Sequence, residues 1–170
     1  MNDRPLSVRR LVARCFVVLA GLSAPLVLAS AAEPTLHDSR FCAPDGVALG
    51  GYDVVSYFQA TGPVRGSAEH ASVQGDLTYH FASEENLAAF AAEPKRYLPT
   101  YLGWCSATLS MGRLACPDFT NYKIEDGALL LFERIGFSNG LDMWNLDPAA
   151  SRRNADGHFA RLREVPSATP

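Results

Sequence analysis

The sequence has none of the short motifs that mark dinucleotide-binding enzymes, zinc proteases or zinc fingers. It contains no glycine-rich phosphate loop, no His-Glu-x-x-His pair and no Cys-x-x-Cys pair. It has no excess of basic residues, because 15 Lys and Arg are set against 18 Asp and Glu, for a net charge of −3. These absences argue against nucleic acid as a partner. What remains is an ordinary globular composition, 48% hydrophobic over 170 residues, which suits one domain.

The first 31 residues have the three-part pattern of a cleaved secretory signal peptide. Arginines precede an apolar run from Cys15 to Leu28, and small residues follow it, with cleavage expected after residue 31 or 32. The run is shorter than the roughly 20 residues that a membrane-spanning helix needs. Arg9-Arg10 keeps twin-arginine (Tat) export open beside the Sec route. We therefore expect a periplasmic or secreted protein with no membrane segment after cleavage.

Cleavage changes both the charge and the number of cysteines. Residues 1–31 hold four arginines and one aspartate, so the mature chain would carry a net charge of −6 and has no electrostatic reason to bind an anionic membrane. Cys42, Cys105 and Cys116 remain, and an oxidising compartment allows them one disulfide. We favour Cys42–Cys116, which would close a loop of roughly 75 residues. The pairs 42–105 and 105–116 stay open.

Residue periodicity predicts an α+β fold of antiparallel β-hairpins with packed helices. Hairpins are predicted over 73–82, with a turn at Gly75-Asp76, and over 122–132, where Asp126-Gly127 supplies the positive φ angles of a tight turn. Hairpins with helices between them argue against a doubly wound parallel sheet. The domain is expected to span 47–164, after a flexible segment at 32–46 and before a disordered tail at 165–170.

Helices are predicted at five places, and one segment reads as extended. The helices are 84–93 capped by Ser83, 94–97, a buried helix from Leu102 or Gly103 to Met111 ended by Gly112, 139–145 around Trp144, and 148–163 with Ala155, Phe159 and Leu162 inward. Residues 52–58 are expected to form a short strand or an extended turn.

Cys105 is the main candidate for a metal-binding or redox role. It stands at a predicted helix start, where the helix N-terminus favours a thiolate, so it could be a soft-metal ligand or a redox thiol. The competing interpretation is a small buried hydrophobic residue beside Trp104. His80, His70 and Met111 are the candidate co-ligands. The simpler interpretations are that the histidines are solvated surface residues and that Met111 fills space in the core. The six tyrosines and Asp53 are expected to make structural hydrogen bonds.

Several motifs, in order, resemble those of exported bacterial YHS-domain proteins. Residues 51–58 (Gly-Tyr-Asp-Val-Val-Ser-Tyr-Phe) are similar to the Gly-Tyr-Asp-Pro-Val-Ala-Tyr-Phe opening of that family, and 79–86 to its Tyr-x-Phe-x-Ser-x-x-Asn segment. Residues 102–106 are similar to its Gly-Gly-Tyr-Cys-Ala. The residues that carry the resemblance are Gly51, Tyr52, Asp53, Tyr57, Phe58, Tyr79, Phe81, Ser83, Asn86, Phe90, Gly103, Trp104, Asp126 and Gly127.

The resemblance implies an association with metals, because shorter YHS domains bind metal through cysteines and some belong to copper-transporting ATPases. This chain departs from them, since Ser56, Ala82 and Asn86 stand where cysteine would be expected. A four-cysteine zinc site is therefore excluded. Cys42 and Cys116 lie outside the family's pattern, which is a further reason to pair them with each other.

Three functions follow as hypotheses. The first is a non-catalytic protein that binds or handles a soft metal ion, copper being the first guess, through Cys105 with His80, His70 or Met111. The second is a metal-free module that binds a periplasmic protein partner or a small ligand through an aromatic surface. The third is a thiol-dependent redox protein. No cofactor other than copper is suggested, and enzyme activity is not the expectation.

Overall fold

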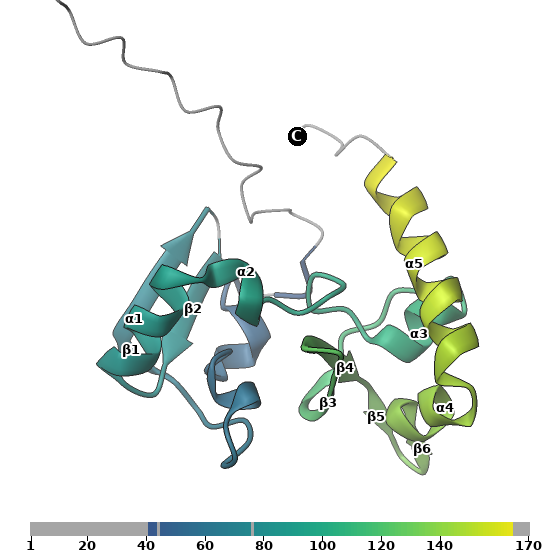
Figure 1. Ribbon diagram of the computed structural model, residues 1–170, viewed down its shortest axis with the longest axis horizontal. Helices are drawn as coiled ribbons and strands as arrows, with labels where there is room; N and C mark the ends of the chain where they lie inside the picture. The colour runs from purple at the N-terminus through teal and green to yellow at the C-terminus, as the bar shows by residue number, and fades with distance from the viewer. Residues whose placement is uncertain (1–40, 44, 76, 165–170) are drawn as a thin grey trace, which may run out of the picture. The chain divides into compact units, whose positions relative to one another are not determined.

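The computed structural model describes residues 41–43, 45–75 and 77–164 (Figure 1). The predicted signal peptide, most of the predicted flexible segment and the predicted tail lie outside the described residues. The described end of that segment packs against the domain, because Phe41 and Cys42 are both buried. The domain therefore begins a few residues earlier than 47.

The α+β prediction is confirmed, with helices and antiparallel hairpins in one chain. The elements are η1 (Ala48–Gly51), η2 (Ser56–Phe58), β1 (Ser67–Gln74), β2 (Leu77–Phe81), α1 (Glu84–Ala92), α2 (Pro94–Tyr97), α3 (Ser106–Ser110), β3 (Asp118–Glu125), β4 (Ala128–Phe132), β5 (Arg134–Ile135), β6 (Ser138–Asn139), α4 (Gly140–Leu146) and α5 (Pro148–Glu164). The described strands pair only as β1–β2, β3–β4 and β5–β6.

Local chemistry accounts for the hairpin ends and helix starts. Asp126 and Gly127, with φ angles of 53° and 76°, make the left-handed two-residue turn that joins β3 to β4. The hydroxyl of Ser83 accepts a hydrogen bond from the backbone N–H of Asn86 and so caps α1. The side chain of Asn139 caps α4 in the same way, by accepting from the N–H of Leu141. The predicted turn at Asp126-Gly127 and the predicted Ser83 cap are confirmed.

Strand β4 separates two buried clusters. Leu129 and Leu131 pack with Tyr57, Tyr79, Phe81 and Phe90 in the first cluster. Leu130 and Phe132 point to the opposite face and pack with Tyr101, Cys105 and Trp144 in the second. Because both faces of β4 are covered, its sequence is an unbroken apolar run rather than an alternating one.

Two local predictions are wrong. Residues 52–58 form no strand: Tyr52 makes a single bridge to Arg65, and Ser56–Phe58 form the 3₁₀ turn η2, closed by the hydrogen bond from the N–H of Gln59 to the carbonyl of Ser56. Helix α3 begins at Ser106, later than predicted, because Leu102 and Gly103 have positive φ angles, 54° and 82°. Cys105 is the N-cap of this helix and makes a bridge to Leu131 of β4.

None of the helices within the described ranges is both long and apolar enough to span a bilayer.

Candidate functional site

Leu49, Gly50 and Gly51 form a left-handed turn, and the two glycines line a pocket that also contains Arg65 and His80. The φ angles of the three turn residues are 52°, 57° and 83°. A Cβ atom on Gly50 would lie 2.8 Å from the Phe119 ring, and one on Gly66 would lie 2.4 Å from the backbone carbonyl carbon of His80. Glycine is thus required at both places, because the backbone approaches a side chain in one and another strand in the other.

Arg65 lies directly opposite Tyr52 in a short antiparallel pairing. The N–H of Gly66 donates to the carbonyl of Gly51 at 2.9 Å, which fixes the register. The guanidinium of Arg65 sits 4.1 Å from the centre of the Tyr52 ring, and its Nη1 donates to the carbonyl oxygen of Gly50. Within the described residues no carboxylate forms an ion pair with Arg65. The Tyr52 ring orients this exposed guanidinium, whose remaining N–H groups can donate hydrogen bonds to a ligand.

The pocket beside Arg65 has a volume of about 400 Å³, which is the size of a small-molecule site. Arg65 and His80 supply hydrogen-bond donors, whereas Val47 and Phe119 supply apolar surface. The Tyr57 hydroxyl donates to the carbonyl of Phe119 at 2.7 Å and so fixes this wall from behind. The complete lining is Asp45, Val47, Gly50, Gly51, Arg65, Gly66, His80 and Phe119. We call it the Arg65 pocket.

Asp53 is completely buried and organises the motif behind the pocket. Its Oδ1 accepts from the N–H of Val55 at 2.8 Å, and its Oδ2 accepts from the N–H of Ala82 at 2.8 Å and from Nδ2 of Asn86 at 2.6 Å. The Ser56 hydroxyl donates to the Asp53 carbonyl at 2.6 Å. Ser56, Ala82 and Asn86 are the three positions at which the resemblance implies cysteine. In this chain they gather around a hydrogen-bonded carboxylate.

Cys105 is fully buried in the second cluster, and its thiol is free. Its Sγ accepts from the backbone N–H of Glu133 at 3.2 Å and from that of Thr108 at 3.5 Å. The thiol therefore acts as a cap for α3 and as an anchor for the end of β4. This arrangement fits the structural interpretation of Cys105.

The predicted co-ligands of Cys105 lie elsewhere. His80 faces the Arg65 pocket, His70 lies on β1 near Glu85, and Met111 is 45% exposed at the end of α3, where a core position was the plainer expectation. No group of three or more His, Cys, Asp or Glu residues suited to a metal ion occurs among residues 41–43, 45–75 and 77–164. Soft-metal binding stays a prediction from the sequence.

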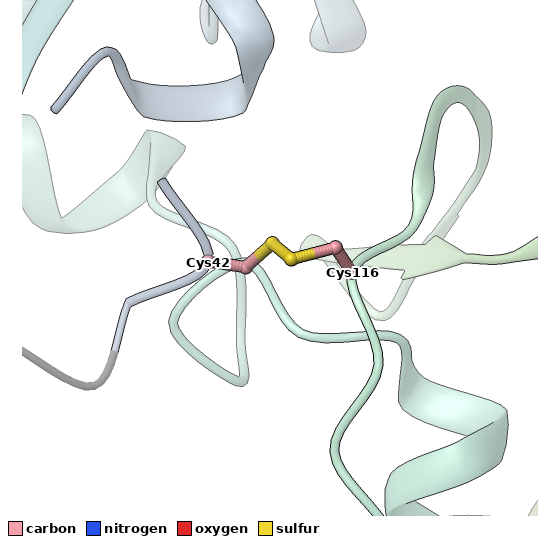
Figure 2. The surroundings of a disulfide bond; sticks show 2 residues. All are labelled: Cys42 and Cys116. Carbon is pink, nitrogen blue, oxygen red and sulfur yellow. A yellow bond between two sulfur atoms is a disulfide. The ribbon is translucent and has the colours of Figure 1, made fainter. Parts of the chain in front are cut away.

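A disulfide joins Cys42 to Cys116, with a Cα–Cα distance of 5.7 Å across 74 residues of sequence (Figure 2). Cys42 is buried and its N–H donates to the carbonyl of Leu102, while Cys116 is exposed. The bond holds the chain just before the Arg65 pocket, whose lining begins at Asp45. Phe41 beside it fills the space over Gly103, where a Cβ would lie 2.7 Å from the Phe41 ring.

Tyr57, Tyr79 and Tyr101 are buried. Burial raises the pKa of Tyr57 and of Tyr79, so both phenols remain protonated. Burial also raises the pKa of Tyr101, whose hydroxyl donates to Asp156 at 2.8 Å. The Tyr79 hydroxyl is buried with no hydrogen-bond partner. The predicted aromatic surface is therefore not made of tyrosines, because four of the six are buried.

The expectation that no serine sits in a Gly-x-Ser-x-Gly pattern is wrong, because residues 136–140 are Gly-Phe-Ser-Asn-Gly. Serine hydrolases place such a serine on a sharp turn between strand and helix, within reach of a histidine. Here Ser138 lies on the two-residue strand β6, and the contact of its hydroxyl is the sulfur of Met143 at 4.0 Å. In the described part of the chain no histidine bonds to Ser138, so the pattern does not form a catalytic pair.

Sequence reasoning missed Arg65, Phe119 and Phe137. Arg65 and Phe119 acquire their roles from the left-handed turn, which brings residues far apart in the chain to one wall. The sequence signal that could have indicated Arg65 is its position directly before Gly66, in the segment that follows Gly50-Gly51. Phe137 stands after Gly136 at a hairpin tip and is fully exposed.

Comparison with known proteins adds no family to this geometry. No family model, no curated protein and no solved structure matches the chain. The likeness to exported YHS-domain proteins therefore stays a prediction that rests on the motifs themselves.

Proposed function

We propose that this protein is a non-catalytic binding module, exported to an oxidising compartment, which takes a small organic anion in the Arg65 pocket. The single observation that carries the proposal is the guanidinium of Arg65, which lies over the Tyr52 ring at the pocket wall without a carboxylate partner among the described residues. The disulfide is compatible with export, because such bonds persist in oxidising compartments.

The walls of the pocket suggest the chemistry of the ligand. A guanidinium offers a fork of N–H donors that matches a carboxylate, and His80 supplies a further ring nitrogen on the neighbouring strand. Phe119 and Val47 add apolar surface to the same pocket. A ligand with a carboxylate at one end and a flat apolar body at the other would satisfy both sides. Benzoate is the simplest probe of that class.

The test is a titration of the ¹⁵N-labelled protein with benzoate, followed by the amide signals of Gly50, Gly51 and Gly66. We expect saturable shifts at these glycines with a Kd on the order of 1 mM or tighter. Arg65→Met should weaken binding by about tenfold or more, because it removes the guanidinium but keeps the length of the side chain. His80→Gln should weaken it by less.

Three controls make the result specific. Arg153→Met removes an exposed arginine on α5 and should leave binding unchanged. Benzamide, the neutral analogue of benzoate, and acetate, which lacks the apolar body, should both bind more weakly than benzoate. If benzamide binds as well as benzoate, or if the shifts persist in Arg65→Met, anion recognition by this pocket is wrong.

A further inference from the structure

A second surface, independent of the Arg65 pocket, is formed by the β5–β6 hairpin. Phe137 at its tip is fully exposed and Ile135 is 66% exposed. Leu114 is 44% exposed and lines a pocket together with Ile135. Isolated apolar side chains are common on protein surfaces, but a fully exposed phenylalanine beside other apolar groups is typical of an interaction site. We call Leu114, Ile135 and Phe137 the hairpin surface.

The hairpin surface combines a projection with a hollow. The pocket lined by Leu114 and Ile135 has a volume of about 340 Å³, and its wall also includes Ser138, the residue that follows Phe137. Backbone groups of the residues behind it are fixed by the core, since the N–H of Glu133 donates to the Cys105 thiol. Phe137, whose exposed ring could fill such a hollow, precedes Ser138 of the pocket wall in the chain.

The same pocket carries one positive and one negative side chain, Arg113 and Glu133. Neither forms an ion pair with any residue in the described ranges. In a two-fold symmetric interface, residue i of one copy meets residue j of the other, and j meets i. One such contact would pair Arg113 with Glu133 twice, once on each side of the axis. The surface therefore carries both members of the charge pair that such a contact needs.

We infer that the hairpin surface is the contact of a symmetric homodimer, in which Phe137 of each copy enters the pocket of the other. The occupant of the pocket is a second copy of this chain. That copy supplies an exposed Phe137 ring to enter the pocket, and it supplies a glutamate for Arg113 and an arginine for Glu133. The dimer requires no ligand in the Arg65 pocket, which lies on different elements, and it does not depend on the function proposed for that pocket.

The test is sedimentation velocity across a concentration series. The protein is expressed from its full sequence in a bacterial host that can export it, and its mass is measured before the experiment. We expect a concentration-dependent dimer with a Kd in the micromolar range. Phe137→Ser and Ile135→Ser should each raise that Kd about tenfold or more, because aromatic and apolar anchors dominate such contacts. Val73→Ser, at a β1 residue that is 67% exposed, is the matched control and should leave the Kd unchanged.

Charge exchange tests the pairing directly. Arg113→Glu and Glu133→Arg should each weaken the dimer, because each places like charges opposite one another. The double variant Arg113→Glu/Glu133→Arg should restore association, since the pairs are re-formed with their signs exchanged. A far-UV circular dichroism spectrum of each variant checks that it is folded.

Two outcomes would overturn the inference. One is a protein that stays monomeric at all concentrations up to the submillimolar range. The other is a dimer that Phe137→Ser does not weaken, which would place the contact on another surface. A dimer that Phe137→Ser weakens but that the double charge variant does not restore would contradict the two-fold pairing of Arg113 with Glu133.

Discussion

Asp53 is the residue on which the local structure of the motif depends most. Its carboxylate accepts from two backbone N–H groups and from the amide of Asn86, so it joins the turn after η1 to the end of β2 and the start of α1. A buried acceptor with several donors is expensive to alter, because each donor left unpaired keeps its desolvation cost.

Asp53→Asn should therefore destabilise the protein although it changes the volume very little. In either orientation the new NH₂ group faces at least one N–H donor. We expect the free energy of unfolding to fall by about 2–3 kcal/mol. Urea denaturation measures this, and Asp142→Asn at an exposed position of α4 is the control, with an expected loss of a few tenths of a kcal/mol. A loss as small as that of the control would show that the network is dispensable.

Cys105 gives a second prediction at this scale. Its thiol is buried and accepts two backbone N–H groups, so Cys105→Ser should lower the free energy of unfolding by about 1–2 kcal/mol. We expect the same loss with and without Cu(I). Thermal unfolding under anaerobic, reducing conditions, with and without added Cu(I), makes the comparison. If Cu(I) stabilises only the protein with Cys105, the thiol is a metal ligand and the soft-metal hypothesis gains its first support.

At the scale of elements, replacing a turn glycine and a helix glycine by alanine should change the free energy of unfolding in opposite directions. Gly127 has a φ of 76°, and a Cβ there would meet nothing within 4 Å. Gly127→Ala should therefore lower the free energy of unfolding by about 1 kcal/mol through backbone conformation alone.

Gly157 lies inside α5, where a Cβ would meet only the end of the Arg161 side chain at 3.8 Å. Gly157→Ala should raise the free energy of unfolding by about 0.5–1 kcal/mol, because alanine is the better helix former. The two variants control each other in one set of denaturation curves. Equal signs would contradict the assignment of a left-handed turn at Gly127 or of helix at Gly157.

Most elements could be predicted because their signals are local. Ser83 caps α1 with its own hydroxyl, and the Asp126-Gly127 turn needs only the conformations of its two residues. The turn over Leu49–Gly51 could not be predicted in the same way. Leu49 adopts a positive φ that its sequence does not favour, and it is held there because its side chain is completely buried among residues from distant parts of the chain.

At the scale of the whole molecule, the carboxylates of Glu125 and Asp118 make the free energy of unfolding depend on pH. Partial burial pulls the pKa of Glu125 upward, but hydrogen bonds from Lys123, Trp144 and Arg152 outweigh it and hold that pKa below its ordinary value. Hydrogen bonds from the hydroxyl and N–H of Thr120 lower the pKa of Asp118. Both groups bind protons more readily in the unfolded chain, so their contribution is fully present above the ordinary carboxyl pKa values and is lost as pH falls.

We therefore expect the free energy of unfolding to decline below about pH 4.5. Glu125→Gln should reduce this decline and should lower the free energy of unfolding by about 1–2 kcal/mol at pH 7, because the carboxylate accepts hydrogen bonds from the indole of Trp144 and the guanidinium of Arg152. Urea denaturation at a series of pH values is the measurement, with Glu69→Gln at an exposed position of β1 as the control. An unchanged pH profile in Glu125→Gln would remove this carboxylate from the explanation.

The amino-acid sequence by itself determined the class of fold and nearly all of the elements, because caps, tight turns and periodicities act within a few residues of one another. It also brought out Asp53 and Cys105 as residues worth attention. Only the tertiary structure decided what they do, since the carboxylate of Asp53 accepts from three separate segments of the chain and the thiol of Cys105 accepts from the residue that follows β4. The Arg65 pocket and the hairpin surface likewise exist only in the folded chain, because packing determines which side chains meet and which stay exposed.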